Sequence, residues 1–344
     1  MVSTIPTDSN IYYHGDYWND IPEVIAYMHK KFSGDPEVSW ISDFKNRYAH
    51  KPFKHALFLC CGNGWLEREF IDEKIVKKAT AFDYSQDLLD QALKAKGNRD
   101  ISYFQADVNT IEFEENQFDL IVNCAALHHV QYIDRLMKVL LKSCQSQGYF
   151  LNFDYIGPSR NQYGAKQWKH IINLNKQLPE YIRHGNLHYP HLPTMLVSDP
   201  TEAIHSALII PTMTNYFKLI EKNDTNGGLA YMLLTHNKKI KNLHPKLRKY
   251  WVKQILLQDN YLTNMREVPV MFSYFIAKPN KKILKNRHLL TQLRQIEESR
   301  ENKAADRLGT YSLPDYLLVK YNPFIHQSKA RLSKLFRYIL SKQL

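Results

Sequence analysis

The sequence has few cysteines, no long apolar run and no apolar segment after Met1. Its four cysteines are Cys60, Cys61, Cys124 and Cys144, and none of them lies in a C-x-x-C pair. We therefore expect no zinc site, and a reducing cytoplasm is the simplest location for the chain. No stretch approaches the roughly 20 apolar residues of a membrane span, so neither a span nor a signal peptide is expected.

Two signatures of phosphate-binding loops are absent as well. The chain contains no G-x-x-x-x-G-K-[ST] sequence, and the turn Cys61–Gly64 lacks the third glycine of a pyrophosphate-binding turn. Glu67 stands in the first turns of the helix expected after this turn, where its charge disfavours an anionic ligand. These absences argue against a nicotinamide oxidoreductase. They favour a ligand that carries an adenosine without phosphates.

The composition is that of a globular protein with a basic end. Apolar residues make up 44% of 344 residues, which suits one large domain with additions, or two domains. The net charge is +12; residues 278–344 hold 15 lysines and arginines and 5 acids, hence +10, which leaves +2 for the rest. No recognisable RNA-binding module accompanies this basic end, so nucleic acid is not the expected partner.

Residues 55–130 alternate between apolar strand signals and helix signals. A short apolar strand, Ala56–Cys60, leads into the glycine-bearing turn and a helix from about Trp65. A second strand ends at Asp83, 19 residues after Gly64, and a third ends just before Asp107. A carboxylate roughly 20 residues beyond such a turn is typical of a ribose-binding position. The pattern predicts one half of a doubly wound α/β sheet.

These residues resemble the core of class I S-adenosylmethionine-dependent methyltransferases. Leu57–Gly64 is similar to the first motif of that family, usually hydrophobic, acid, hydrophobic, Gly, Cys, Gly, x, Gly. Phe58 replaces the usual acid and Cys60 replaces the first glycine. The resemblance implies a Rossmann-like seven-stranded α/β sheet and S-adenosylmethionine as cofactor. The implied cofactor-binding residues are Cys61, Gly62, Asn63, Gly64, Asp83, Tyr84, Asp107, Val108, Asn123 and Ala125.

Methyl transfer to a hydroxyl requires a base, and three residues are candidates. A sulfonium methyl is already activated, so the protein has to align the acceptor, exclude water and take up a proton. His128, His129 and Asp154 follow strands whose carboxyl ends face the expected ligand. The alternatives are that the histidines only pack at the strand end and that Asp154 caps the helix after Gly157. No metal is expected, because no cluster with ligand spacing is evident.

The substrate side is expected to come from the N-terminal aromatics and from residues after Asp154. The candidates there are Tyr13, Trp18, Tyr155, Arg160, His188 and His205. The aromatics could instead pack the cap on the sheet, and Arg160 could pair with Asp154. The order Asp199-Pro200-Thr201-Glu202 predicts the start of a helix that carries His205 and ends near Pro211.

The acceptor class follows from the segment after the fourth strand. It begins Asn123-Cys124-Ala125-Ala126 rather than the Asn/Asp-Pro-Pro-aromatic of methyltransferases that act on planar amines. We therefore expect an oxygen acceptor on a small molecule, a glycan or a lipid-linked group. The alternatives are an N-methyltransferase acting on RNA or protein, and a catalytically silent binding module with this fold.

Four regions follow from these assignments. Residues 1–50 are expected to form a helical cap, 51–155 the cofactor-binding core, and 156–278 a helical substrate-side insertion with the last strands. Residues 279–344 lie outside the resemblance and form a basic helical extension. Its last helix, about Ile325–Leu340, has an apolar and a basic face, which suits either an anionic membrane or docking on its own domain. The oligomeric state is not indicated.

Overall fold

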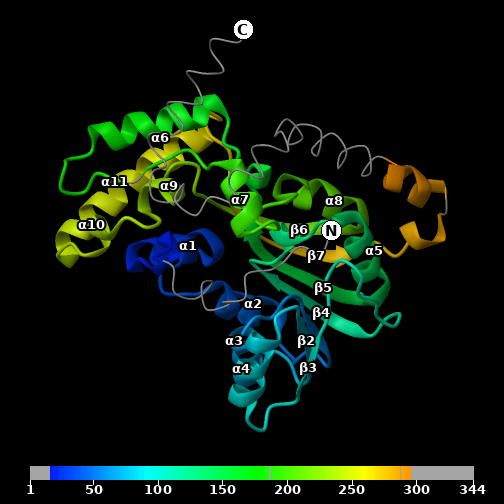
Figure 1. The fold of residues 1–344 in the computed structure, drawn as a ribbon. Helices are drawn as coiled ribbons and strands as arrows, with labels where there is room; N and C mark the ends of the chain where they lie inside the picture. Colours follow the sequence, from blue (N-terminus) through cyan, green and yellow to red (C-terminus); the bar gives the residue numbers. More distant parts are fainter. Residues whose placement is uncertain (1–15, 186, 287, 296–344) are drawn as a thin grey trace.

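A computed structural model describes residues 16–185, 187–286 and 288–295. Within them the chain forms one seven-stranded sheet with the order β3-β2-β1-β4-β5-β7-β6 (Figure 1). The strands are β1 Ala56–Phe58, β2 Ala79–Asp83, β3 Ile101–Gln105, β4 Phe118–Cys124, β5 Cys144–Tyr155, β6 Phe217–Asn226 and β7 Phe272–Pro279.

The strand directions confirm the doubly wound α/β fold that was predicted. Strands β1 to β5 pair in parallel, whereas β7 is antiparallel to both β5 and β6. The chain passes from β1 outward to β3 and then returns to place β4 on the other side of β1. This reversal makes the carboxyl ends of β1 and β4 the switch point, where open α/β sheets bind their ligands.

Helices cover both faces of the sheet (Figure 1). One face is packed by the cap, the β1–β3 connections and the insertion, and the other chiefly by α5 and α8. The helices of the first face are α1 Pro22–Ser33, α2 Trp40–Tyr48, α3 Trp65–Asp72, α4 Gln86–Lys96, α6 Ala165–Gln177, α9 Ala230–Leu234, α10 Lys238–Lys241 and α11 Pro245–Asn264. On the second face lie α5 Ile133–Ser143 and α8 Ile209–Tyr216. The remaining helices are α7 Leu192–Ser198 and the short 3-10 turns Trp18–Asp20, Leu127–His129, Ser159–Asn161, Ser206–Leu208 and Ile283–Lys285.

The central strands are buried on both faces, as expected of parallel strands between helices. In β1, Phe58 faces the core layer under the cap and Leu57 faces the opposite layer. Phe58 is 1% exposed and its ring meets that of Phe70 edge to face at 5.3 Å. The phenylalanine at the position where the resembling family has an acid is therefore a core residue that joins β1 to α3.

The prediction that a helix starts at Asp199 is wrong. Asp199 does accept hydrogen bonds from the backbone of Thr201 and Glu202, as a helix cap would. However, Ala203 has a φ of 49°, so the chain leaves the helical path after one turn. Helix α8 begins only at Ile209. Pro211 therefore lies in the first turn of α8, where its missing N–H costs no hydrogen bond.

Residues Leu192–Ser198 of the insertion form α7. Residues 288–295 are helical, whereas the amphipathic helix predicted over Ile325–Leu340 lies outside the described residues. Among the helices that are described, none combines the length and apolar character needed to cross a membrane.

Helix α3 buries an acid directly beneath the glycine turn. Glu67 is fully buried, and neither of its carboxyl oxygens has a hydrogen-bond partner among the described residues. Burial raises the pKa of Glu67 to about 7. The folded protein therefore keeps a proton on Glu67 at pH values at which an unfolded chain loses it.

Ionisation of Glu67 should make the protein less stable as the pH rises. From the ordinary pKa of 4.5 to the folded value of about 7, the free energy of unfolding should fall and then level off. The total loss is about 3 kcal/mol. Urea unfolding at pH 5 and pH 8 should show this loss, and Glu67→Gln should remove most of it. Glu114 is exposed, so the control variant Glu114→Gln should keep the full loss of stability between pH 5 and pH 8. Equal losses in the two variants would contradict a raised pKa of Glu67.

Candidate active site

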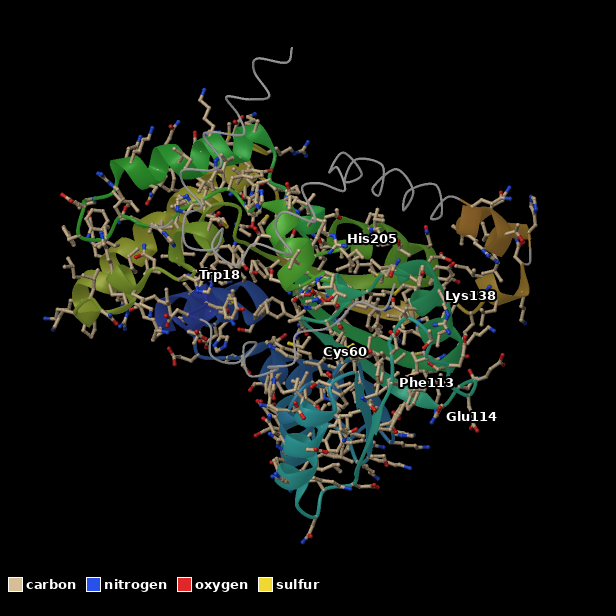
Figure 2. The ribbon with its side chains drawn as sticks, in the orientation of Figure 1. Trp18, Cys60, Phe113, Glu114, Lys138 and His205 are labelled. Atoms are coloured by element: carbon tan, nitrogen blue, oxygen red, sulfur yellow. The ribbon has the colours of Figure 1, made fainter. Side chains whose placement is uncertain are left out.

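The candidate site lies along the carboxyl ends of β1, β2, β4 and β5. Figure 2 labels Cys60 at the end of β1, Trp18 in the cap and His205 in the insertion, three parts of the chain that are far apart in sequence. Two loops form the floor of the site: the turn from Cys60 to Gly64, and the turn after β4 that contains His128 and His129.

The glycine turn has a backbone that only glycine adopts easily. Gly62 and Gly64 have φ values of 56° and 75°. A Cβ on Gly64 would lie 2.4 Å from the Tyr103 hydroxyl and 2.9 Å from a carboxyl oxygen of Glu67. The turn is closed by a hydrogen bond from the Gly64 N–H to the Cys61 carbonyl. Gly64 is thus required both for its conformation and for the space beside Tyr103.

Cys60 also has a left-handed backbone, with a φ of 44°. This position is the first glycine of the resembling motif, so the structure gives a physical reason for that glycine. A non-glycine residue in this region costs about 1–3 kcal/mol. Burial, together with the charges of Asp83, Asp107 and Asp154, raises the pKa of the Cys60 thiol far above its ordinary value. The thiol therefore stays protonated and is not a nucleophile at neutral pH.

Asp83 joins the end of β2 to the glycine turn. One of its carboxylate oxygens accepts a hydrogen bond from the Gly62 N–H and the other from the Ser85 N–H, both at 2.8 Å. The side chain is 9% exposed, and burial raises its pKa. At the neighbouring strand end, Asp107 accepts from the backbone and side chain of Asn109. Two carboxylates on adjacent strands beside a glycine turn fit a ligand that presents a ribose and a base.

The other predicted cofactor residues occupy varied positions. Tyr84 is exposed, and Val108 is partly buried against the apolar layer that includes α5 and α8. Asn123 is fully buried beneath the strand end, and Ala125 has a φ of 54°. The Asn63 carboxamide accepts from the Trp65 N–H at the start of α3. Their contact with a cofactor remains a prediction.

Asp154 is the centre of the acceptor side. It is 1% exposed, and its carboxylate accepts five hydrogen bonds. Its Oδ2 atom accepts hydrogen bonds from the Asn123 side chain at 2.7 Å and from the backbone N–H groups of Ala126 and Leu127 at 3.1 and 2.8 Å. Its Oδ1 atom accepts from His128 Nδ1 at 2.6 Å and from the Tyr155 N–H at 2.7 Å. Asp154 therefore does not cap a helix after Gly157. It holds the turn that carries the two histidines.

The two histidines lie side by side, with ring centroids 4.1 Å apart. Burial alone would lower the pKa of His128, but the charge and hydrogen bond of Asp154 outweigh it and raise the pKa to about 9. Burial and the neighbouring charge of His128 lower the pKa of His129. At neutral pH, one ring therefore carries a proton on both nitrogens and the other is neutral.

Glu202 completes this group from the insertion. Its Oε2 atom lies 3.8 Å from His128 Nε2 and 3.9 Å from His129 Nε2. We call His128, His129 and Glu202 the histidine cluster. Burial raises the pKa of Tyr17, Tyr155, Tyr163 and Tyr231, and the charge of Glu202 contributes in each case. Of these four rings, that of Tyr155 packs edge to face on His128, with centroids 6.2 Å apart.

The alternative that Arg160 pairs with Asp154 does not hold, and its predicted contact with substrate remains a prediction. The Arg160 guanidinium instead donates to the backbone carbonyls of Pro200 and Glu202, and its N–H to that of Ala203. Asp154 already accepts five donors, which leaves no room for a guanidinium. Arg160 has a φ of 58° and holds the turn that carries Glu202. It is therefore a structural support in this arrangement.

The other substrate-side candidates divide into neighbours of the cluster and residues that point elsewhere. The Tyr155 ring lies 6.2 Å from that of His128. Burial and the charge of Arg160 lower the pKa of buried His205 to about 4. Trp18 is 1% exposed and packs on Phe272, as the packing interpretation of the cap proposed. His188 is exposed, and Tyr13 lies outside the described residues.

Sequence reasoning missed the part that Glu202 plays. Glu202 was considered only as a helix-capping residue, and the loss of that helix is what turns its side chain toward the histidines. Thr201 and Asn161 were missed as well: Thr201 contacts His129 and Asn161 contacts Glu202. No local signal marks them, because all three contacts join residues more than 40 positions apart.

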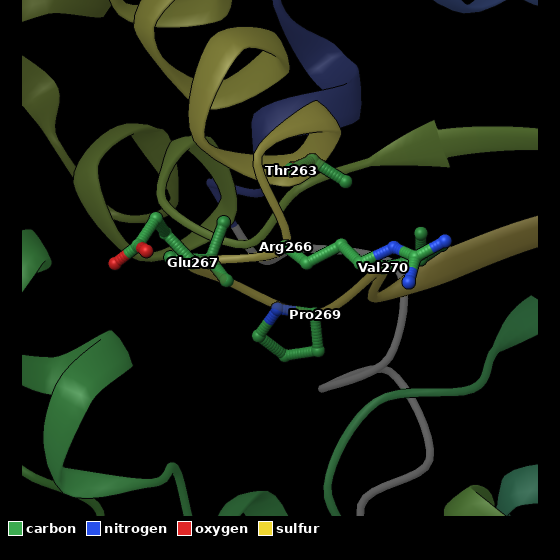
Figure 3. Close-up of a pocket in the computed structure, with 6 residues that line it drawn as sticks. Thr263, Arg266, Glu267, Pro269 and Val270 are labelled. Carbon is green, nitrogen blue, oxygen red and sulfur yellow. The ribbon is translucent and has the colours of Figure 1, made fainter.

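A separate pocket of about 450 Å³ lies at the connection between α11 and β7 (Figure 3). It is lined by Thr263, Arg266, Glu267, Val268, Pro269 and Val270. None of the predicted site residues contributes to it. It is therefore distinct from the strand-end site.

Comparison with known proteins decides the family. A family profile described as a methyltransferase domain matches residues 57–152. Those residues form a domain of the class I S-adenosylmethionine-dependent methyltransferase family. This confirms the family predicted from the glycine turn and Asp83, and S-adenosylmethionine as the methyl donor of that family.

Individual relatives are more distant. The demethylmenaquinone methyltransferases of two Leptospira interrogans strains are 27% identical over 157 residues, or 43% of this chain and 62% of theirs. The match thus spans less than two thirds of those relatives. A Mesorhizobium loti S-adenosylmethionine-dependent methyltransferase structure is 17% identical, with a TM-score of 0.41, over 66% of this chain and 91% of that one. A Haemonchus contortus phosphoethanolamine N-methyltransferase 2 structure is 15% identical, with a TM-score of 0.44, over 69% and 51%.

Gly64 offers a direct test of the turn geometry. Gly64→Ala should lower the free energy of unfolding by about 1–3 kcal/mol, because it adds a strained backbone and a clash with Tyr103. Gly164, the residue before α6, has an ordinary φ of −60°, and a Cβ added there would have nothing within 4 Å. Gly164→Ala should therefore change stability by less than about 1 kcal/mol. Equal effects of the two changes in chemical denaturation would refute the geometry.

Proposed function

We propose that this chain is an S-adenosylmethionine-dependent methyltransferase that methylates an oxygen of a small-molecule, glycan or lipid-linked acceptor. The observation that carries the proposal is the hydrogen bond between His128, which lies in the residues that match a methyltransferase domain, and Asp154, which lies just beyond them. It fixes an ionisable group at the switch point of the sheet, next to the glycine turn. In this position a cofactor and an acceptor would meet.

The cofactor half of the proposal rests on the glycine turn and the strand-end acids. Asp83 would accept hydrogen bonds from the ribose hydroxyls, and Asp107 and Val108 would border the adenine. The methionine end would lie along the backbone from Cys61 to Gly64, where glycine leaves the peptide accessible. When bound, S-adenosylmethionine supplies a methyl group already activated on a sulfonium. The protein's part is to align the acceptor with that methyl and exclude water.

The acceptor half rests on the histidine cluster. A hydroxyl must lose its proton to become a good nucleophile, and imidazoles and carboxylates are the groups that accept one. The cluster presents the neutral His129 imidazole and the Glu202 carboxylate as proton acceptors, and Asp154 holds the protonated His128 ring beside them. A neutral amine nitrogen already has a lone pair for attack, so it depends less on a base that removes a proton beforehand. The cluster therefore favours oxygen over nitrogen as the acceptor atom.

The tyrosines beside Glu202 indicate the nature of the acceptor. Tyr155 and Tyr163 are buried and Tyr231 packs on Tyr155 and Phe272, so the side of the site next to Glu202 is aromatic, which suits an acceptor with an aromatic ring. The Leptospira relatives are named for demethylmenaquinone. Isoprenoid quinols and simple phenols are therefore the first acceptors to assay. Release of S-adenosylhomocysteine with any of them would support the proposal, and cofactor binding without turnover across acceptor classes would favour a silent binding module.

Asp83 tests the cofactor placement. Asp83→Ala should weaken binding of S-adenosylmethionine at least about tenfold in calorimetric titration, because two ribose hydroxyls lose their acceptor. Asp83→Asn keeps an oxygen for the Gly62 N–H, so it should stay folded and still bind weakly. Asp72→Ala removes an exposed acid that pairs with Arg99 and serves as the control. Unchanged affinity in a folded Asp83 variant would refute the placement.

His128 tests the acceptor side. His128→Gln keeps an N–H for Asp154 but loses the ring, so methyl transfer should fall by roughly 10²–10⁴-fold. Binding of S-adenosylmethionine should stay within about twofold of the unmodified protein, since the cluster lies on the acceptor side. His170 on α6 pairs with Glu267, which is partly buried between α11 and β7. His170→Gln should alter neither quantity, and full activity of His128→Gln would exclude a catalytic part for the ring.

A further inference from the structure

We propose that the histidine cluster binds a divalent transition-metal ion through His128 Nε2, His129 Nε2 and the Glu202 carboxylate. The prediction that no metal is bound rested on spacing along the chain alone. The fold brings Glu202 to the histidines from the insertion, so that one ligand atom of each residue lies within 4.8 Å of the others.

The distances suit an ion better than direct hydrogen bonds. The two nitrogens lie 3.8 and 3.9 Å from the same carboxylate oxygen, which is too far for a hydrogen bond. Ligand atoms on a tetrahedral zinc ion are separated by roughly 3.4 Å, given bonds of about 2.0–2.1 Å. The two nitrogen–oxygen separations would close by about half an ångström, and the two nitrogens, which lie within 4.8 Å of each other, would close by up to about 1.4 Å, which rotation of the side chains can supply.

Both imidazoles are held by their Nδ1 atoms. His128 Nδ1 donates to Asp154 at 2.6 Å. His129 Nδ1 lies 3.1 Å from the Thr201 hydroxyl oxygen, and that hydroxyl is 2.9 Å from Asp199. Because the carboxylate of Asp199 can only accept, the Thr201 proton goes to it and the Thr201 oxygen accepts from His129. Both rings thus carry a proton on Nδ1 and turn Nε2 toward Glu202, and a metal ion would take the place of the Nε2 proton of His128.

This arrangement is the one that metal-binding histidines have. A ligating imidazole almost always donates its other N–H to a carboxylate or another oxygen, which fixes the ring and strengthens the ligand. Here Asp154 and Thr201 fill those two places. The third ligand is oriented too, since the second carboxylate oxygen of Glu202 accepts from the Asn161 side chain at 3.1 Å. All three ligands therefore have a supporting partner.

The ligand set indicates both the type of ion and its part in the reaction. Two imidazoles and one carboxylate suit Zn²⁺, Fe²⁺ or a similar ion rather than Mg²⁺, and three protein ligands leave a position open. Resting on the proposed function, we place the acceptor hydroxyl in that open position. The ion would stabilise the oxygen anion. Because the imidazoles and Glu202 would then be metal ligands, the hydroxyl proton would pass to water instead of to the cluster before the oxygen takes the methyl group.

Metal binding to the full-length, untagged chain tests the site without reference to turnover. After chelation and dialysis, Zn²⁺ titration by calorimetry should show one tight site per chain. His129→Gln and Glu202→Gln should each weaken it at least about tenfold, and Thr201→Val, which removes only the support of His129, by roughly 10–100-fold. His170→Gln is the matched control, since His170 also faces a glutamate on the surface, and should bind as the unmodified protein does.

Cobalt substitution separates this cluster from the cysteines. Co²⁺ at the histidine cluster should give visible d–d absorption without the strong charge-transfer band of thiolate ligation, which Cys60 and Cys61 would produce. No stoichiometric binding, a thiolate band, or affinity unchanged in the Glu202 and His129 variants would overturn the proposal. Thermal unfolding of each variant shows whether a loss of binding reflects a loss of folding.

Different measurements would refute the metal site and the proposed function. Zn²⁺ binding lost in the cluster variants, in a protein that does not bind S-adenosylmethionine, would support the site and refute the methyltransferase activity. Binding of S-adenosylmethionine and turnover that survives chelation would refute the site and leave the activity in place. If both hold, chelation should abolish methyl transfer while affinity for S-adenosylmethionine changes little.

Discussion

The acceptor side of the structure depends on one buried carboxylate. Asp154 is almost fully removed from water, and a charge in that position is tolerated only when hydrogen bonds replace its hydration. Its five donors come from the end of β4, the turn that follows, and its own strand. The carboxylate therefore fixes the turn relative to β5, and it fixes His128 together with the turn.

On the cofactor side, a second carboxylate likewise accepts backbone N–H groups. Asp83 accepts backbone N–H groups from the β1 turn and from the start of α4, so β1 and β2 are joined as β4 and β5 are. Cys60 follows β1 at a position where the chain takes a left-handed backbone, and the charges of both carboxylates raise the pKa of its thiol. The reversal of strand order places the glycine turn after β1 beside the histidine turn after β4. The candidate residues on both turns therefore lie at the switch point.

The parts of this arrangement that were predicted correctly are those with local signals. Alternating strands and helices, the glycine turn and the spacing to Asp83 all reside within short stretches, and the match to a methyltransferase domain covers the same residues. The helix at Asp199 shows where such signals fail. Its capping residues are present, but Ala203 is held in a left-handed conformation by the Arg160 N–H, and the Ile204 N–H bonds to the carbonyl of His128. Those partners lie more than 40 positions away, so no local pattern could reveal them.

The same contacts make the insertion part of the core rather than a cover for it. The turn that carries Glu202 is attached to the histidine turn through the Ile204 N–H and to the segment after β5 through Arg160 and Asn161. Any movement of the insertion would therefore shift Glu202 relative to the two imidazoles.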